Sequence, residues 1–273
     1  PVASRAADWN ELSTMVRAMG EVNAGILELA GEPTGARAET AEPYFNSLKD
    51  LSVETGRPIT FGMFSTRMKP QAWRPWFDVI DQAAIEGGRL FVQVHSRALS
   101  VLLSFETTTP FDKFPVWQDI RALPLDEQKA AFRNSETKAK LVAAANTPPN
   151  GPKAIGTEAR PPEWDWLFYM DSVEGPNQSM AEIAQQRGVS PVEAMIDIAL
   201  ETDFKAFFRQ PIANEDQDQA LDMMKHPRSV VTFSDSGAHV SQIMDSSLQT
   251  HIFSHWVREK QAFTLEEAVR LVT

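Results

Sequence analysis

The chain has 273 residues, of which 42% are hydrophobic, so it can form one large α/β domain or two small ones and is not a disordered protein. Its 26 basic and 37 acidic residues give a net charge of −11, and no basic run forms a phosphate-binding stripe, so we expect no nucleic-acid partner. Cysteine is absent, which excludes disulfides, a thiol nucleophile and thiolate metal ligands and favours a cytoplasmic location.

Helices and apolar strands alternate along the first hundred residues. A helical spacing of apolar residues predicts the helices, and the short apolar runs after them predict strands. The expected helices cover residues 8–19, 41–54 and 71–86. The expected strands cover residues 24–29, 58–64 and 90–95. Because these strands are largely apolar and alternate with helices, they are typical of a parallel sheet that is buried on both faces.

The second half of the chain is less regular. We expect irregular insertions near residues 105–124 and 146–162, which are rich in proline. Three further strands are predicted at residues 166–170, 204–208 and 229–233. The helices of this half are predicted at residues 215–225 and after the capping residues Ser179, Ser190 and Thr264.

Six strands that alternate with helices predict an α/β fold of the (β/α)8 TIM-barrel type. We expect a single, incomplete barrel segment over residues 1–273, with a doubly wound open sheet as the alternative. No stretch approaches the roughly 18 apolar residues of a membrane span, so we expect no membrane partner. The sequence leaves open whether the chain forms an oligomer.

Polar and charged residues follow the predicted strands at their carboxyl ends. They are Glu28, Ser65-Thr66-Arg67, His95-Ser96-Arg97, Asp171 and Asp235. In a barrel, such positions converge at the mouth although they are far apart in the sequence. The set holds carboxylates, a histidine and arginines, so this edge is the predicted place for catalysis or binding.

Asp235 ends the apolar run in the stretch "VVTFSDSGAHV". A carboxylate there could act as a general base toward a metal-bound water or as a metal ligand. On spacing alone, N-capping of a following helix is an equal alternative. His239 lies four residues later and is close enough to orient Asp235.

His95 directly follows a nearly continuous apolar strand and could bind zinc through a ring nitrogen. For a lone histidine, a hydrogen-bonded position at a strand end is the favoured interpretation. Arg97 shares a face with His95 and could grip a substrate carboxylate or pair with a neighbouring acid. His251 and His255 have helical spacing, but no zincin glutamate follows His251, so we interpret both as incidental residues of a packed helix.

The order of segments resembles a known family. "VVTFSDSGAHV" followed by "HWVREKQAFTLEEAVRLVT" resembles the amidohydrolase superfamily, in its branch of D-aminoacylases and N-acyl-D-amino-acid deacylases. "PVASRAADWNEL" and "GGRLFVQVHSR" are similar to further stretches of this branch, so the resemblance spans nearly the whole chain. It implies a metal-dependent (β/α) barrel beside a small β-sandwich, with an aspartate after the last barrel strand that takes and returns the proton.

The resemblance implies hydrolysis of the N-acyl amide bond of N-acyl-D-amino acids or related small amides, with a divalent metal, zinc, as cofactor. It places the catalytic role on Asp235 and a metal ligand at or near His95. We expect Arg97 to bind the substrate carboxylate, with Gln93 and Ser236 as further substrate contacts. The alternatives are a cyclic-amide hydrolase of the dihydropyrimidinase or hydantoinase type and a non-catalytic barrel remnant without a complete metal site.

Three features of the family are absent from the sequence. No H-x-H pair occurs, and "PITFGMFSTRM" has Met63 or Phe64 where D-aminoacylases carry a histidine ligand. The closing β-sandwich segments, expected after Thr273, are missing as well. We therefore expect the chain to be an internal segment of a longer deacylase, with a branch that has a reduced metal site as the alternative.

Overall fold

The computed structural model describes residues 7–29, 38–146, 162–232, 243 and 247–273. The chain divides into two compact units, which we describe one at a time. Unit 1 consists of the described residues of Pro1–Leu99, Ala213–Ser234 and Ser246–Thr273. Unit 2 consists of those of Ser100–Ile212 and Asp235–Asp245. The expectation of one barrel segment over the whole chain stays a prediction.

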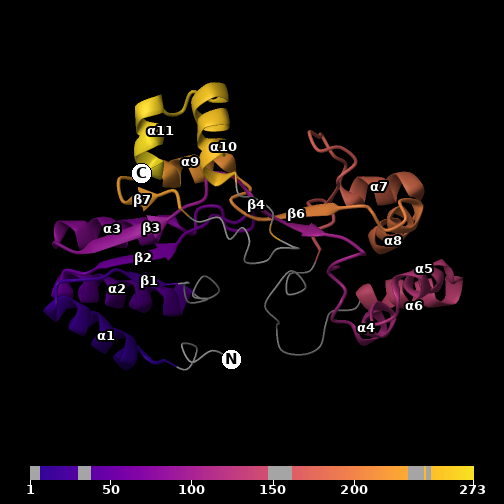
Figure 1. Cartoon of the computed structure of the whole chain (residues 1–273), viewed down its shortest axis with the longest axis horizontal. Coiled ribbons are helices and arrows are strands. Elements are labelled where there is room, and N and C mark those ends of the chain that lie inside the picture. Colours follow the sequence, from indigo (N-terminus) through magenta and orange to yellow (C-terminus); the bar gives the residue numbers. More distant parts are fainter. Residues whose placement is uncertain (1–6, 30–37, 147–161, 233–242, 244–246) are drawn as a thin grey trace. The chain divides into compact units, whose positions relative to one another are not determined.

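Unit 1 contains a four-stranded parallel sheet (Figure 1). The strand order is β1-β2-β3-β7, with β1 at Leu27–Leu29, β2 at Pro58–Gly62, β3 at Arg89–Gln93 and β7 at Ser229–Val230. All four were predicted from their apolar runs, although β7 and β1 are shorter than expected. Since the strands are parallel, their carboxyl ends meet at one edge of the sheet.

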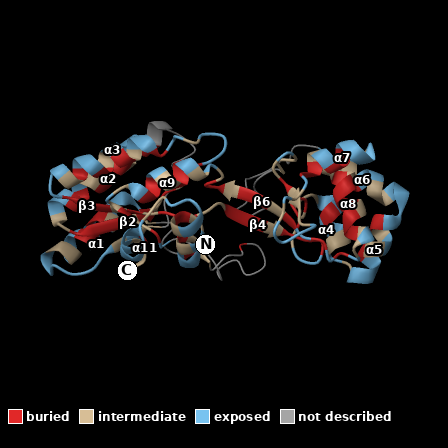
Figure 2. Ribbon diagram, turned by 90° about the horizontal axis from the view of Figure 1, so that it is seen from above, coloured by how far each residue is buried: buried red, intermediate tan, exposed pale blue. Residues whose placement is uncertain are grey.

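Helices pack around this sheet and close the core of unit 1. They are α1 (Trp9–Glu21), α2 (Ala38–Thr55), α3 (Arg74–Ile85), α9 (Gln217–Lys225), α10 (Leu248–His251), a π-helix (Ile252–Glu259) and α11 (Leu265–Val272). The buried positions lie mainly on β2 and β3 and on the helix faces turned toward them (Figure 2). The largest fully buried side chains here are Leu48, Leu51, Ile59, Ile80 and Leu90.

Unit 2 combines a small sheet with short helices. Its three strands follow the order β4-β6-β5, with β4 at Leu99–Leu103, β6 at Phe208–Ala213 and β5 at Phe168–Tyr169, and β5 runs antiparallel to β6. Its helices are α4 (Pro115–Arg121), α5 (Leu125–Arg133), α6 (Ser135–Ala145), α7 (Met180–Arg187) and α8 (Pro191–Glu201). The capping box predicted at Ser179 is confirmed, because its hydroxyl accepts from the Glu182 N–H while the Glu182 carboxylate accepts from the Ser179 N–H.

The strand predicted at residues 204–208 is wrong. Phe204 instead ends a turn after α8, with φ of 67° and its N–H donating to the Ala199 carbonyl at 2.6 Å. The apolar side chain is fully buried, so the sequence shows the same hydrophobic signal as a strand would. The strand itself starts only at Phe208.

The described strands form a mixed α/β fold and do not close into a barrel. In particular, β4 follows β3 with no helix between them, which breaks the predicted alternation. Most of the predicted insertion at residues 146–162 lies outside the described residues, and the one near residues 105–124 includes helix α4. Among the helices of the described ranges, none has both the length and the apolar composition that crossing a membrane requires.

Candidate functional site

The carboxyl edge of the unit 1 sheet gathers polar side chains from segments that are distant in the sequence. The residues of this edge site are Glu28, Ser65, Gln93, His95, Ser96, Arg97, Asn214 and His251. They come from the ends of β1, β2 and β3, from the turn before α9 and from α10. Parallel α/β sheets bind ligands at this edge because the loops there diverge and expose side chains and backbone groups.

Asn214 links the ends of β2 and β3 and is fully buried. Its side-chain oxygen accepts from the Ser65 N–H at 2.9 Å, and its side-chain amide donates to the His95 carbonyl at 3.3 Å. Its own N–H donates to the Ser65 carbonyl at 2.9 Å. The backbone φ of 54° lies in the left-handed region, which asparagine tolerates better than most residues. Asn214 thus fixes the position of the His95 backbone.

We expect Asn214→Gly to lower the free energy of unfolding by about 2–3 kcal/mol. The substitution leaves the buried Ser65 N–H and the buried His95 carbonyl without the hydrogen bonds that the Asn214 side chain provides. Glycine is chosen since it accepts the left-handed φ without strain. Urea denaturation followed by circular dichroism measures the change. Gln261→Gly is the matched control, because Gln261 is exposed with φ of 51° and should lose little stability. Equal losses in both variants would contradict a bridging role for Asn214.

His95 is fully buried at the end of β3. Its Nδ1 lies 2.8 Å from the Arg97 carbonyl oxygen and 3.3 Å from the Arg97 N–H. The shorter contact favours a proton on Nδ1, which then donates to the carbonyl. Nε2 is buried and has no hydrogen-bond partner among the described residues. Burial lowers the pKa of His95, so the ring is neutral at neutral pH and Nε2 carries a lone pair.

Helix α10 and the π-helix are hydrogen-bonded to Ser96, in the segment after β3. The Ser96 hydroxyl donates to the Leu248 carbonyl at 2.8 Å, and the Trp256 ring N–H donates to the Ser96 carbonyl at 2.6 Å. Ile252 and Trp256 are buried, as the prediction of a packed helix requires. π-Helical turns often occur at functional sites, because the inserted residue redirects neighbouring side chains.

His251 is half-buried at the start of this π-helix and belongs to the edge site. Its pKa is lowered to about 4, first by burial and then by His255, Arg97 and His95 nearby. Its Nδ1 is buried without a hydrogen-bond partner in the described part of the chain. The ring stacks on His255 with centroids 4.9 Å apart. Helical spacing alone marks both histidines as incidental, whereas the hydrogen bond from Ser96 to Leu248 shows that α10 lies against the segment that follows β3.

The other predicted site residues have different outcomes. Gln93 donates from its side-chain amide to the Glu28 carboxylate at 2.9 Å, which joins the ends of β3 and β1. Arg97 is half-buried two residues beyond His95, and its contact with substrate stays a prediction. Asp171 belongs to unit 2. The three residues predicted after β7, namely Asp235, Ser236 and His239, lie outside the described residues.

Two imidazoles of the edge site, those of His95 and His251, each have a ring nitrogen of a type that can bind a metal ion. His95 Nε2 and His251 Nδ1 are two ring nitrogens that are buried and lack partners, and each neutral ring can offer one lone pair. Over the ranges that the structure describes, no group of three or more histidine, aspartate or glutamate residues could hold a metal. The described residues therefore do not form a metal site by themselves.

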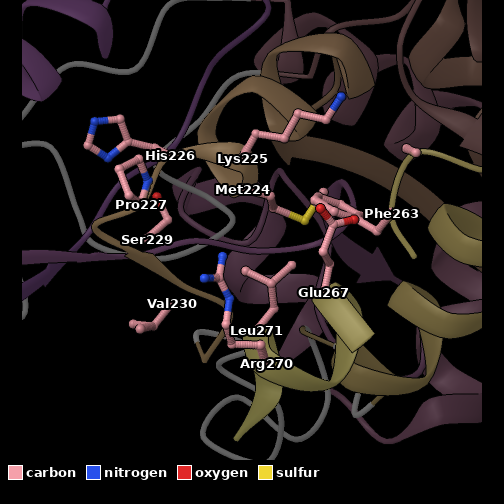
Figure 3. Close-up of a pocket in the computed structure, with 11 residues that line it drawn as sticks. Met224, Lys225, His226, Pro227, Ser229, Val230, Phe263, Glu267, Arg270 and Leu271 are labelled. Atoms are coloured by element: carbon pink, nitrogen blue, oxygen red, sulfur yellow. The ribbon is translucent and has the colours of Figure 1, made fainter. Parts of the chain in front are cut away.

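A pocket of about 490 Å³ lies elsewhere in unit 1, between the end of α9, the start of β7 and α11 (Figure 3). Three of its polar side chains already have partners within the fold. The Glu267 carboxylate accepts from the Thr264 N–H in a helix cap, and the Ser229 hydroxyl donates to the Met223 carbonyl at 2.6 Å. His226 contacts the Asp81 carboxylate at 3.1 Å. Because the pocket is at the amino end of β7, it is separate from the edge site, which we consider the better place for chemistry.

Two solved structures share the fold of this chain. The first is N-acyl-D-glutamate deacylase from Bordetella bronchiseptica, complexed with zinc and a phosphonate inhibitor that mimics the tetrahedral intermediate of the reaction. Its TM-score is 0.52 and its sequence identity is 16%, and the superposition covers 99% of this chain and 45% of the deacylase. The second is a D-aminoacylase described as defining a novel subset of amidohydrolases, with a TM-score of 0.50 at 12% identity, over 98% of this chain and 44% of that one.

These similarities are similarities of fold. The chain spans less than half the length of either deacylase, 45% and 44%. No protein-family model and no curated protein matches the sequence. The match nevertheless extends over 99% and 98% of this chain, so the likeness of fold is not confined to one of its two units.

Proposed function

We propose that this chain is part of a metal-dependent amidohydrolase that cleaves the N-acyl amide bond of N-acyl-D-amino acids or related small amides. The observation that carries the proposal is the likeness of fold to two deacylases over 98–99% of the chain. It is supported by the edge site, where polar side chains lie at the end of a parallel sheet at which α/β enzymes place their chemistry.

A divalent metal, zinc, is the cofactor that we propose, and the Bordetella deacylase was solved with zinc. His95 would hold the ion through Nε2, the ring nitrogen that has no partner among described residues. A bound zinc polarises the amide carbonyl and lowers the pKa of a water molecule. The Arg97 carbonyl accepts the Nδ1 proton of His95 and thereby keeps Nε2 free for the ion.

Asp235 is the proposed general acid and base, and its support comes from the sequence. It follows β7 in the sequence, in the stretch that resembles the segment with the catalytic aspartate in the D-aminoacylase branch. Its carboxylate would take a proton from water during attack and return it to the leaving amine. His239 would orient this carboxylate, and Ser236 would contact the substrate.

Arg97 and Gln93 are the proposed substrate contacts among the described residues. A guanidinium binds a carboxylate through two parallel hydrogen bonds, so Arg97 suits the free carboxylate of an N-acyl amino acid. Gln93 is held by Glu28 and presents its amide group from β3. A substrate without a carboxylate would lose the interaction with Arg97.

The proposed function is tested with the protein expressed from its whole gene. We expect zinc-dependent release of the amino acid from N-acetyl-D-amino acids. The L-enantiomers should be turned over at least about tenfold more slowly, because a site that binds both the carboxylate and the acyl group of a substrate discriminates between enantiomers. Turnover of dihydrouracil or hydantoin instead would replace this substrate class with cyclic amides. No turnover of any amide by the zinc-loaded protein would refute an enzymatic role.

A further inference from the structure

We propose that the pocket between α9, β7 and α11 binds a small organic carboxylate that has an apolar chain, of the kind of hexanoate. The inference goes beyond the proposed function and does not rest on it. The pocket lies at the amino end of β7, whereas the edge site lies at the carboxyl ends of the strands. Binding to the pocket can therefore be measured without any turnover.

The pocket has a suitable size, and hydrogen bonds hold its walls. Its volume of about 490 Å³ is within the range of roughly 300–1,000 Å³ that small-molecule sites occupy. The Val231 N–H donates to the Leu271 carbonyl at 3.4 Å, which ties α11 to the segment after β7. In the turn between α9 and β7, the Arg228 N–H donates to the His226 ring at 3.2 Å. The walls thus belong to the hydrogen-bonded frame of unit 1.

The charged side chains that line the pocket give it a net positive charge. Lys225 and Arg270 are cationic, and each lies in the last turn of its helix, where the helix dipole stabilises a positive charge. Among the described residues that line the pocket, Glu267 supplies the only carboxylate. Burial lowers the pKa of His226, so its ring is neutral at pH 7. The balance of charge favours a ligand with a single negative charge.

Arg270 is the residue best placed to bind that charge. Its guanidinium extends from α11 toward β7 (Figure 3). It forms no hydrogen bond or ion pair with the part of the chain that the structure describes, and it is exposed. The Glu267 carboxylate, by contrast, accepts from the Thr264 N–H at 2.8 Å in the helix cap. A guanidinium can donate two parallel hydrogen bonds to one carboxylate, so Arg270 suits a carboxylate ligand.

Apolar side chains line the pocket beside Arg270 and select the body of the ligand. Val230, Phe263 and Leu271 are each only partly buried, so they present apolar surface to the pocket. Apolar surface that a ligand covers contributes to binding roughly in proportion to its area. Acetate has little such surface and inorganic phosphate has none. A carboxylate with an aliphatic chain can use both the guanidinium and the apolar wall.

Hexanoate binding by the protein expressed from its whole gene tests the inference. Calorimetry and ligand-observed nuclear magnetic resonance measure Kd, which we expect to be about 1 mM for so small a ligand. Hexanamide has the chain without the charge, whereas acetate and inorganic phosphate have charge without the chain. All three should bind at least about fivefold more weakly than hexanoate.

Substitutions assign the binding to the pocket. Arg270→Gln removes the charge of an exposed side chain and should raise Kd for hexanoate at least about fivefold, and Arg270→Glu should abolish measurable binding. Arg258→Gln is the matched control, because Arg258 is exposed in the last turn of the π-helix and does not line the pocket. Arg97→Gln removes the carboxylate-binding group proposed for the edge site. Both should change Kd less than about twofold, and circular dichroism checks the fold of each variant.

The inference is wrong if the unmutated protein does not bind hexanoate. Loss of binding in Arg97→Gln with binding kept in Arg270→Gln would place the carboxylate at the edge site and overturn it as well. Equal affinities for hexanoate and hexanamide would show that Arg270 does not recognise the charge. Displacement of hexanoate by an equal concentration of phosphate would show that the apolar wall selects nothing. Because none of these measurements involves hydrolysis, each result holds whether or not the protein cleaves amides.

Discussion

Asp235→Asn is expected to lower kcat for N-acyl-D-amino acid hydrolysis by about 10²- to 10⁴-fold, which is the usual contribution of a general acid or base. Asparagine has nearly the same shape as aspartate but cannot take a proton from water. We therefore expect KM to change little, because the loss falls on the proton transfer and not on substrate binding. Steady-state kinetics with N-acetyl-D-amino acids measures both parameters in the protein expressed from its whole gene.

Asp78→Asn is the matched control for this substitution. Asp78 is an exposed carboxylate on helix α3 and is not one of the residues of the edge site. Its replacement should leave kcat within about twofold of the unmutated enzyme, as for most exposed residues away from a site. If Asp235→Asn keeps full activity, Asp235 is not the acid and base, and the proposed hydrolysis would need another proton carrier.

The parallel sheet was predictable because its signal is local. Each of β1, β2 and β3 is a short apolar run that follows an amphipathic helix, and this pattern can be recognised without knowledge of distant contacts. The capping box at Thr264 was predictable for the same reason, since its partner Glu267 is three residues away. Strand lengths were predicted less well, because strand ends depend on pairing with other strands.

The missed elements of unit 2 have weak local signals. Helix α6 buries Leu141 and helix α5 buries Gln128 and Phe132, so neither shows a clear apolar stripe. β4 was missed for another reason. Its apolar run, Leu99–Leu103, follows β3 directly, and the expected alternation of helix and strand leaves no place for it.

The edge site was only partly predictable because it depends on long-range contacts. His95 and Arg97 were found since they follow a recognisable strand. Asn214 was not found, because its partners Ser65 and His95 are 149 and 119 residues away in the sequence. His251 was named but assigned to packing, since nothing in helical spacing indicates that α10 lies against the end of β3. Asp235 stays a prediction from sequence.

The core of unit 2 is a cluster of aromatic rings centred on Phe105, which is fully buried. Its ring centroid lies 5.3 Å from Phe132, 5.4 Å from Phe204, 6.2 Å from Trp117 and 6.4 Å from Phe208. These partners come from α4, from α5, from the turn after α8 and from β6. The cluster therefore joins α4, α5 and the turn after α8 to strand β6.

We expect Phe105→Ala to lower the free energy of unfolding by about 3–5 kcal/mol, because it removes a large buried ring and leaves a cavity that rigid neighbours fill poorly. Phe105→Leu should cost less, about 1–2 kcal/mol, since leucine retains most of the apolar volume. Urea denaturation measures both values, and near-ultraviolet circular dichroism reports the loss of fixed aromatic packing.

Phe207→Ala is the control, because the Phe207 side chain is 48% exposed only three residues after Phe204 and should cost less than about 1 kcal/mol. A loss in Phe105→Ala no larger than in Phe207→Ala would show that the aromatic cluster does not hold unit 2 together. A large loss limited to Phe105 would instead show that α4 and α5, which the sequence pattern missed, are stabilised by this one cluster through Trp117 and Phe132.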